Sequence, residues 1–405
     1  MPYLKNLENK IGQIMKISNT VSQGRFNYPQ TEARIYRKYF RRAQTEMERS
    51  GQLILGSGVS NFEAKFAKWI GNGISSDQVI GVATGTDALE LALRSCGIKP
   101  SQKVALPSHT AYGTVAAILR LGAVPVFIDI GIDSSTICPI DLKKRLETFP
   151  EIKAVIAVHL YGESCELDSL LKICKEFSIS LIEDCAQSFG TFYKGKSVGT
   201  FGDRSAFSFY PTKNLAAMGD AGLFIANTSD DALVFSRRLR FYGWDNSREA
   251  VQEGVNSRID EIQARLLSAK LLDIDKRISQ RRNVAKIYQS QLEHLREKMD
   301  ILSLPSDGIN WSHSYHLYVI RVNSKYRNLI AKYCIEKGIP VGIHYPKACH
   351  QQSFLSTSRY RLKNTEKFVE QILSLPINPY LKERDIKKVS NILKESIKSA
   401  KNEGS

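Results

Sequence analysis

The stretch KAVIAVHLYGESCELDSLLKICKEFSISLIEDCAQSFG (153–190) contains one complete unit of the pattern that decides the fold. Its first part, KAVIAVHLY, is a short and continuous apolar run, which is typical of a strand buried on both faces. ELDSLLKICKEF follows with apolar residues at helical spacing, and SISLIED (178–184) is a second apolar run. The unit therefore predicts a strand, a helix and a second strand parallel to the first.

The same alternation extends in both directions from this unit. Segments with helical patterns, DALELALRSC and TVAAILRLG, separate the apolar runs that come earlier in the chain. This alternation predicts an α/β fold in which helices cover both faces of a parallel or mixed sheet. The further runs that predict strands are QVIGVA (78–83), KVALP (103–107), VPVFIDI (124–130), SAFSFY (205–210) and GLFIAN (222–227).

The texture of the sequence changes after a long helical pattern that runs from Ile259 past Tyr288. YHLYVIRV, a further helical segment and GIPVGIHYP then indicate a mixed α+β arrangement. We therefore expect a large domain over residues 46–270 and a smaller C-terminal domain over residues 271–405, which ends in an amphipathic helix. Residues 1–45 form an N-terminal extension that we expect to pack partly on the small domain.

The composition limits the partners of the chain. Its formal net charge is +16, and the densest basic run, RKYFRR (37–42), predicts a solvated surface because no nucleic-acid-binding pattern accompanies it. No apolar window is long enough to cross a membrane, and MPYLKNLENKIGQIMK lacks the apolar core of a secretory signal. The seven cysteines include no CxxC pair, which favours reduced thiols. We expect a cytoplasmic protein without a metal, nucleic-acid or membrane partner.

Side chains that can carry chemistry gather where the predicted strands end. SISLIED ends in Glu183 and Asp184, and ligands of open α/β sheets collect at the carboxyl ends of strands. Asp184 there is either a cap of the strand end or the partner of a cationic group in a ligand. The aromatic strand that follows leads to Ser208, whose hydroxyl can donate to phosphate, and then to Lys213. A lysine removed from water has a lowered pKa, which suits an amine that forms a Schiff base.

A candidate anion site precedes these residues in VATGTDALELAL (82–93). Gly85 and Thr86 join a predicted strand to a predicted helix, and a glycine lets the backbone approach an anion closely. The first N–H groups of a helix and its macrodipole favour phosphate. A plain turn between a strand and a helix would have the same sequence, so this segment is informative only together with the others.

Together these segments resemble the DegT/DnrJ/EryC1/StrS family of pyridoxal-phosphate-dependent sugar aminotransferases. The resemblance runs from GSGVSNFEAKFAKWIG (56–71) to LSLPINPYL (373–381), and its longest motifs are PSHTAYGTVAAILRLGAVPVFIDI and IEDCAQSFGTFYKGKSVGTFGD. It implies the type I fold of pyridoxal-phosphate-dependent transferases, with a mainly parallel seven-stranded sheet in the large domain and a smaller α+β domain. It also implies a homodimer whose active sites are shared between the subunits.

The resemblance assigns a role to each candidate site residue. It makes Lys213 the residue that carries pyridoxal phosphate as a Schiff base and later moves the proton. Asp184 becomes the partner of the pyridine nitrogen, because a protonated ring is the electron sink. The remaining implied contacts are Gln187 to the ring face or its hydroxyl, Gly85, Thr86 and Ser208 to the phosphate, and Asn256 to the phosphate in the other subunit.

The implied reaction transfers an amino group from glutamate to a keto sugar, usually one linked to a nucleoside diphosphate, in amino-sugar, polysaccharide or natural-product biosynthesis. Two alternatives stay open: an acceptor that is a keto-cyclitol without a nucleotide, and a sugar dehydratase on the same scaffold. Such dehydratases carry histidine in place of the Schiff-base lysine, so Lys213 argues against the second alternative. Intact Lys213 and Asp184 also argue against a non-catalytic regulator.

The sequence departs from the family pattern at two places. Ala221 replaces a glycine in GDAG (219–222), so the loop there must accept a Cβ. In PSHTAY, Ala111 occupies the position of the aromatic residue that usually stacks on the cofactor ring. His109 and Tyr112 are the neighbouring rings that remain, and the flanking sequence aligns without a gap, which argues against Tyr112.

Overall fold

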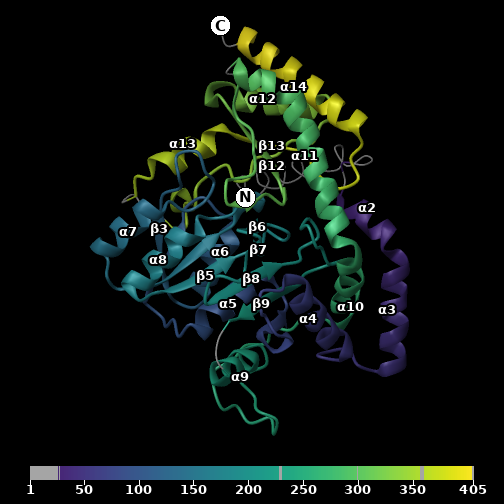
Figure 1. The fold of residues 1–405 in the computed structure, drawn as a ribbon, viewed down its shortest axis with the longest axis vertical. Helices are drawn as coiled ribbons and strands as arrows, with labels where there is room; N and C mark the ends of the chain where they lie inside the picture. Colours follow the sequence, from purple (N-terminus) through teal and green to yellow (C-terminus); the bar gives the residue numbers. More distant parts are fainter. Residues whose placement is uncertain (1–25, 27, 228–229, 299, 356–359, 404–405) are drawn as a thin grey trace, which may run out of the picture.

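A computed structural model describes residues 26, 28–227, 230–298, 300–355 and 360–403. A large sheet and a small sheet lie one above the other, and the long helix α11 (Ile274–Glu297) runs along the side of both (Figure 1). Most of the expected N-terminal extension, including residues 1–25, lies outside the described part of the chain. None of the described helices is both long enough and apolar enough to cross a membrane.

The large sheet confirms the expected mainly parallel arrangement of seven strands. Its order is β1-β9-β8-β5-β4-β2-β3, and only β9 (Gly222–Ala226) runs antiparallel to its neighbours. Each of the seven predicted apolar runs forms one of these strands. The other six are β1 (Val79–Val82), β2 (Lys103–Pro107), β3 (Val124–Ile128), β4 (Ile152–Val158), β5 (Ser180–Asp184) and β8 (Arg204–Ser208).

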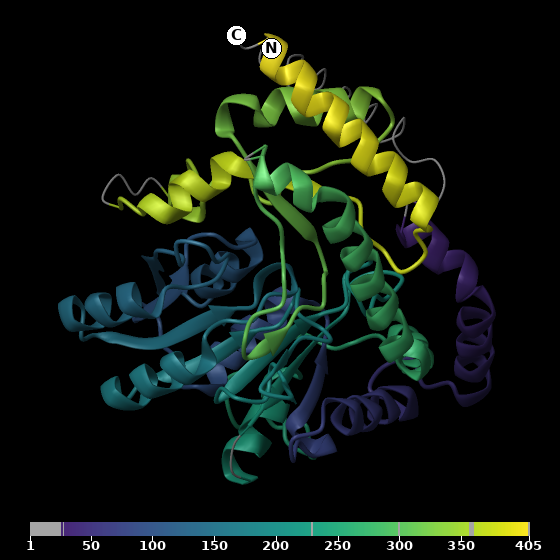
Figure 2. The ribbon, with the colours of Figure 1, turned by 45° about the horizontal axis from the view of Figure 1, so that its top comes forward.

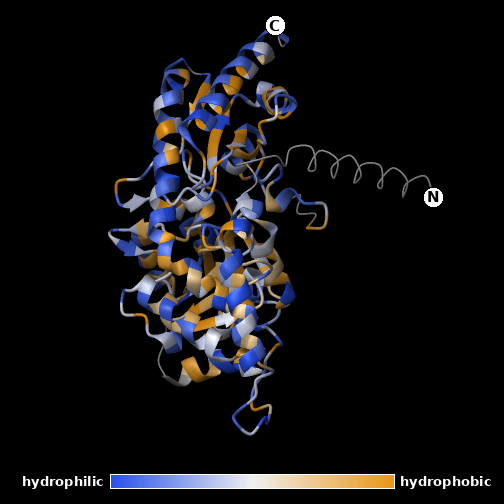
Figure 3. Ribbon diagram, turned by 90° about the vertical axis from the view of Figure 1, so that its right-hand side faces the viewer, coloured by the Kyte–Doolittle hydropathy of each residue, from blue (hydrophilic) through white to orange (hydrophobic). Residues whose placement is uncertain are grey.

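Helices cover both faces of this sheet because its strands bury side chains on both sides. In β4, Ile156 packs with the apolar residues of α5 and α6, whereas Val155 and Ala157 pack with those of α7 and α8. Figure 3 shows apolar strands inside the body and polar residues on the outer helices. The covering helices are α4 (Ser57–Ile70), α5 (Gly85–Ser95), α6 (Tyr112–Arg120), α7 (Pro139–Thr148), α8 (Leu167–Phe177), α9 (Asp230–Leu239) and α10 (Glu261–Lys270).

The small sheet is antiparallel and has the order β10-β12-β13. Its apolar side chains pack with those of α11, α12 and α14, so these helices cover it (Figure 2). The predicted amphipathic C-terminal helix is α14 (Glu383–Glu403), whose buried residues include Ile386 and Leu393. The remaining elements here are β10 (Ile301–Ser303), β12 (Tyr318–Val322), α12 (Ser324–Glu336), α13 (Lys363–Gln371) and β13 (Ile372–Leu375).

The long helical pattern after Ile259 forms two helices rather than one. Ile259 precedes the first of them, and Asp260 at its N-cap is extended and bridges Ile54. A 3-10 turn at Leu271–Asp273 then separates α10 from α11. The break redirects the chain, because α10 packs on α4 of the large sheet whereas α11 packs on α14.

Several contacts cross the domain boundary that the sequence suggests. β11 (Trp311–Ser312) pairs with β6 (Phe192–Tyr193), which in turn pairs with β7 (Lys196–Ser197). Phe368 joins the apolar cluster of the large sheet. The division into residues 46–270 and 271–405 therefore stays a prediction.

Two N-terminal helices connect the two parts of the molecule along one edge (Figure 1). α3 (Arg37–Ser50) packs on α10, and the basic residues of RKYFRR on it are exposed, as expected. α2 (Tyr28–Ile35) lies beside α11, and its buried residues Tyr28 and Glu32 both contact Tyr380 near the C-terminus.

Candidate active site

A cavity of about 540 Å³ lies beside the carboxyl ends of β5 and β8. Three parts of the chain form its walls: the loops after these strands, the segments around the small sheet, and the start of α2. Lys213 and Gln187 come from the first part, His316 and Tyr345 from the second, and Tyr28 from the third. The structure therefore brings together segments that are widely separated in the sequence.

Lys213 lies in the loop that follows β8. Its backbone N–H donates to the carbonyl of Tyr210 at 2.8 Å, and Ala217 closes the loop by donating to Phe209 at 2.7 Å. The side chain is half-buried. Burial lowers the pKa of Lys213 to about 8, although the negative charge of Asp184 opposes this shift. A larger share of this amine is unprotonated near neutral pH than of an ordinary lysine, as the sequence interpretation requires.

Asp184 ends β5 and is buried. Its Oδ2 accepts a hydrogen bond from the Thr114 hydroxyl at 2.9 Å, and its Oδ1 accepts from the backbone N–H of Ala186 at 3.0 Å. Burial raises the pKa of Asp184, while these two hydrogen bonds and the positive charge of Lys213 oppose the rise. A cationic group placed against this carboxylate would therefore be strongly stabilised.

Gln187 links the large sheet to the small-sheet side of the cavity. Its Oε1 accepts from the backbone N–H of Tyr161 at 2.9 Å, and its Nε2 donates to the hydroxyl of Tyr345 at 3.1 Å. These bonds fix the orientation of the amide. Sequence reasoning found Gln187 but missed Tyr161 and Tyr345, because nothing in their sequence context distinguishes them from core tyrosines.

The candidate phosphate residues meet at the start of α5. Thr84 caps this helix by accepting from the backbone N–H of Asp87 at 3.0 Å. Gly85 lies so close to Ser208 that a Cβ at Gly85 would be 2.6 Å from the Cβ of Ser208. Only glycine fits at this position, and the close packing holds the Ser208 hydroxyl beside the free N–H groups of the helix, including that of Thr86.

Asn256 is exposed in the single chain. Its backbone bridges Phe241. The next residue, Ser257, is buried and accepts from Ala83 at 3.1 Å, just before α5. Successive residues of an extended segment point to opposite sides, so Asn256 points away from this chain's own helix.

The two rings near Ala111 are placed differently. The loop ends at Ala111, and Tyr112 begins α6 with 42% of its surface exposed. His109 is buried, and its Nε2 lies 2.5 Å from the Tyr161 hydroxyl. Its ring also meets Phe368 edge-on, with 5.0 Å between the centroids. Burial lowers the pKa of His109 to about 3, so the imidazole is neutral.

The other departure from the family pattern, Ala221, causes no backbone strain. Ala221 is buried and is not among the described residues with positive φ, whereas Gly219 in the same loop has a φ of 155°. The carbonyl of Ala221 accepts from Phe209 at 2.9 Å. The extra Cβ is therefore accommodated, and the loop keeps a glycine where its conformation needs one.

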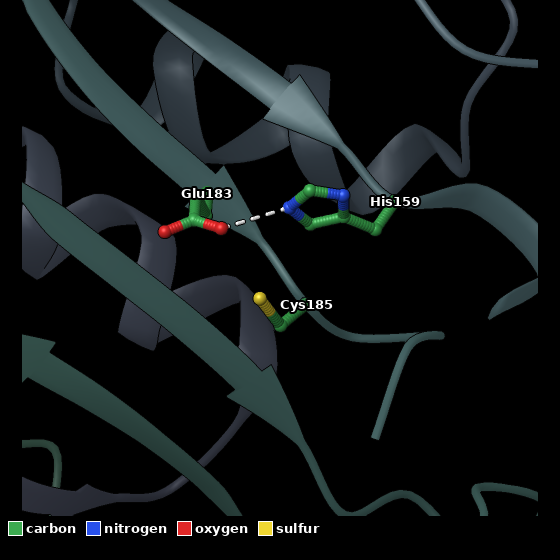
Figure 4. A group of neighbouring side chains, drawn as sticks. All are labelled: His159, Glu183 and Cys185. Carbon is green, nitrogen blue, oxygen red and sulfur yellow. Dashed lines mark hydrogen bonds and ion pairs between the residues drawn. The ribbon is translucent and has the colours of Figure 1, made fainter. Parts of the chain in front are cut away.

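His159, Glu183 and Cys185 form a buried group whose possible ligand atoms lie within 4.8 Å of one another (Figure 4). Both carboxylate oxygens of Glu183 and both ring nitrogens of His159 already have partners. The His159 ring donates from Nε2 to Glu183 at 3.0 Å and accepts at Nδ1 from the N–H of Cys165. Glu183 also accepts from three backbone N–H groups, those of Gly199, Phe201 and Gly202. The group is a hydrogen-bonded support for the loop at residues 199–202.

Comparison with known proteins agrees with this arrangement. The model of the DegT/DnrJ/EryC1/StrS aminotransferase family matches residues 35–394. The chain belongs to this family. A relative from Aneurinibacillus thermoaerophilus, dTDP-3-amino-3,6-dideoxy-alpha-D-galactopyranose transaminase, is 38% identical over 87% of this chain and 94% of its own length.

Two solved structures show the same fold. The crystal structure of S. venezuelae DesV in complex with a ketimine intermediate has a TM-score of 0.84 and 32% identity, and the match covers 91% of this chain and 97% of DesV. NtdA from Bacillus subtilis, solved with the bound cofactor PMP, has a TM-score of 0.84 and 25% identity over 93% of this chain and 86% of its own. The chain is therefore an aminotransferase with the expected fold.

Proposed function

We propose that this enzyme uses pyridoxal phosphate to transfer an amino group from glutamate to a keto sugar linked to a nucleoside diphosphate. The observation that carries the proposal is the pairing of Lys213 with Asp184. The Lys213 amine, whose pKa is lowered, lines the cavity, and it lies close enough to the buried Asp184 carboxylate for each charge to shift the pKa of the other. The dideoxy-sugar transaminase relative and the PMP-bound NtdA structure support the substrate class and the cofactor.

The residues present fit pyridoxal phosphate at each of its polar groups. Lys213 would bond the aldehyde carbon, and Asp184 would hold the protonated ring nitrogen. The N-terminus of α5 at Gly85 and Thr86, together with the Ser208 hydroxyl, would hold the phosphate. Gln187 would contact the ring face or its hydroxyl. When bound, the cofactor supplies an electron sink that stabilises negative charge at the carbon beside the transferred nitrogen.

The side chains of this chain have distinct tasks around that chemistry. The Nζ of Lys213, with a pKa of about 8, can accept a proton and return it near neutral pH. Asp184 keeps a positive charge opposite its carboxylate, because burial makes an uncompensated negative charge there unfavourable. The bonds of Gln187 to Tyr161 and Tyr345 keep its amide in one orientation.

We also propose a homodimer in which Asn256 completes the phosphate site of the partner. Large side chains near the site are exposed in the single chain, including Tyr210 at 52% and Tyr242 at 39%. Tyr210 lies in the Lys213 loop, and Tyr242 bonds to Val255 beside Asn256. Exposed apolar groups in these segments support burial against a second copy. The seven unpaired cysteines support a cytoplasmic location.

Borohydride reduction of the purified enzyme tests the cofactor assignment. We expect the visible absorbance of the yellow protein to disappear and the reduced cofactor to be attached to Lys213 in a peptide digest. Lys213→Ala should bind the cofactor without a covalent bond and lose transamination. Attachment to another lysine would contradict the assignment. A panel of nucleotide-linked keto sugars with glutamate as donor then identifies the acceptor.

A further inference from the structure

A group of buried polar side chains lies between α2, α10 and α11. Glu32 is 3% exposed, and Lys270, from the end of α10, is fully buried. The Lys270 Nζ donates to Glu32 at 2.8 Å, and the Arg277 guanidinium and the Tyr380 hydroxyl also donate to Glu32. Burial raises the pKa of Glu32, but the positive charges of Arg277 and Lys270 outweigh this effect and lower the pKa overall, so the carboxylate is ionised. Buried charges are tolerated only when paired in this way.

This buried charge cluster (Glu32, Lys270, Arg277, Tyr28 and Tyr380) touches the Lys213 loop at two points. The Lys270 Nζ donates to the backbone carbonyl of Ala216 at 2.7 Å. The Tyr28 hydroxyl accepts from Arg277 at 2.6 Å and lies 3.4 Å from the carbonyl of Lys213 itself. Both contacts on the loop therefore depend on a cation that is bound to Glu32. Lys270 makes the first contact directly, and Arg277 positions Tyr28 for the second.

The Lys213 loop needs such support because it has no regular secondary structure. Besides the two backbone hydrogen bonds made by Lys213 and Ala217, its other anchors are side-chain bonds to the backbone. The Asn214 amide donates to the carbonyls of Phe189 and Ser314 at 3.1 and 3.2 Å, and Gln263 exchanges two bonds with Met218. The position of the amine depends on these bonds, because no helix or strand fixes the backbone at Lys213.

We propose that the buried charge cluster is a positioning device for the Lys213 amine, in which Lys270 and Tyr28 are positioning residues and Glu32 holds both in place. A reacting group must be kept within about 0.5 Å of its productive position. The cluster meets this need from the N-terminal helix α2, which also lines the cavity through Tyr28. The proposal rests on the proposed function only in taking Lys213 as the cofactor-binding lysine.

Hydrogen–deuterium exchange of the cofactor-free protein tests the device directly. Lys270→Met removes the bond to Ala216 but leaves Glu32 paired with Arg277, so we expect this variant to fold. Exchange of the peptide that covers residues 213–217 should accelerate about tenfold or more, because a buried carbonyl loses its charged donor. Tyr36→Phe is the matched control. It removes a bond of 2.7 Å to Asp273 in the same interface, and the loop should exchange as in the wild type.

Tyr28→Phe provides the second arm, because it keeps the ring on Tyr380 and removes only the hydroxyl. The acylation rate of Lys213 is measured against pH in the cofactor-free protein. We expect its apparent pKa to rise towards that of an ordinary lysine in Tyr28→Phe and Lys270→Met, but not in Tyr36→Phe. Loop exchange and acylation profiles that match the wild type in both variants would overturn the proposal. Borohydride attachment away from Lys213 would overturn the proposed function instead, and leave the exchange result intact.

Discussion

Glu183 and Asp184 are adjacent buried carboxylates on β5, yet their surroundings are opposite. Glu183 receives hydrogen bonds from three backbone N–H groups and from His159. Burial raises the pKa of Glu183, but the bonds from His159 and the backbone lower it overall. Asp184 has two donors, and burial raises its pKa overall. One carboxylate has all its acceptor positions occupied within the chain, whereas the other has two donors and can still accept from a cationic group of a ligand.

The two residues point to opposite sides because side chains alternate along a strand. Glu183 therefore faces the loop at residues 199–202, and Asp184 faces Thr114 and Lys213. The difference teaches that burial of a carboxylate does not by itself indicate function. The number of hydrogen-bond donors that already bind a buried carboxylate separates a structural group from a binding group.

Replacing each carboxylate by its isosteric amide should show the difference between the two positions most clearly. Asp184→Asn should lower transamination on the order of 10²–10³-fold, because an electrostatic partner of the reacting group is lost. The same change should raise the melting temperature of the cofactor-free protein at pH 7. Glu183→Gln should lower the melting temperature, because buried N–H groups lose their acceptor at a cost of about 1–3 kcal/mol each.

The pH dependence of unfolding checks the predicted directions of these two changes in melting temperature. The folded pKa of Glu183 lies below its unfolded value of about 4.3, so its stabilisation exists above that pH and is lost as the pH falls further. The folded pKa of Asp184 lies above its unfolded value, so its ionised form weakens the apo protein as the pH rises. Equal melting temperatures for both variants and the wild type at pH 7 would show that the two carboxylates do not differ.

Asn256 extends the comparison, because it too is a polar residue near the site, and it is exposed in the single chain. Mixed Lys213→Ala and Asn256→Ala subunits should regain activity if each site takes Asn256 from the partner. Random exchange gives about one quarter of wild-type activity, since half of the dimers are mixed and each holds one intact site. Assays before and after exchange measure this gain. No gain, or a sedimentation mass of one chain, would contradict shared sites.

His109 is intermediate between Glu183 and Asp184, and its replacement should have the smallest effect of the variants considered. Its Nε2 is bonded to Tyr161, but its Nδ1 is buried without a hydrogen-bond partner among the described residues. We expect His109→Ala to weaken retention of pyridoxal phosphate several-fold and Tyr112→Phe to leave it unchanged, because a stacked ring contributes about 0.5–1.5 kcal/mol. Equilibrium dialysis of both variants measures the affinity. Equal affinity of His109→Ala and the wild type would place His109 with Glu183, as a structural group.

The strands and the candidate site residues at their ends could be predicted because each has a local signal in the sequence. The seven strands are continuous apolar runs, and Asp184 and Lys213 follow directly from the rule that ligands bind where parallel strands end. Lys270 and Glu32 had no such signal. Both lie in polar helical stretches that resemble solvated surfaces, and only the packing of α2 against α10 buries them. The break between α10 and α11 was also hidden, because the helical periodicity continues through Leu271–Asp273.

The buried charge cluster also sets an order of events during synthesis. Glu32 is near the start of the chain, while its partner Tyr380 follows 348 residues later. A ribosome that adds about 5–20 residues per second needs roughly 17–70 s between these two residues. Throughout that interval the emerging Glu32 lacks its Tyr380 donor, although Asp184 and Lys213 are made well before the interval ends. The buried charge cluster behind the Lys213 loop therefore becomes complete only when translation of the chain is almost finished.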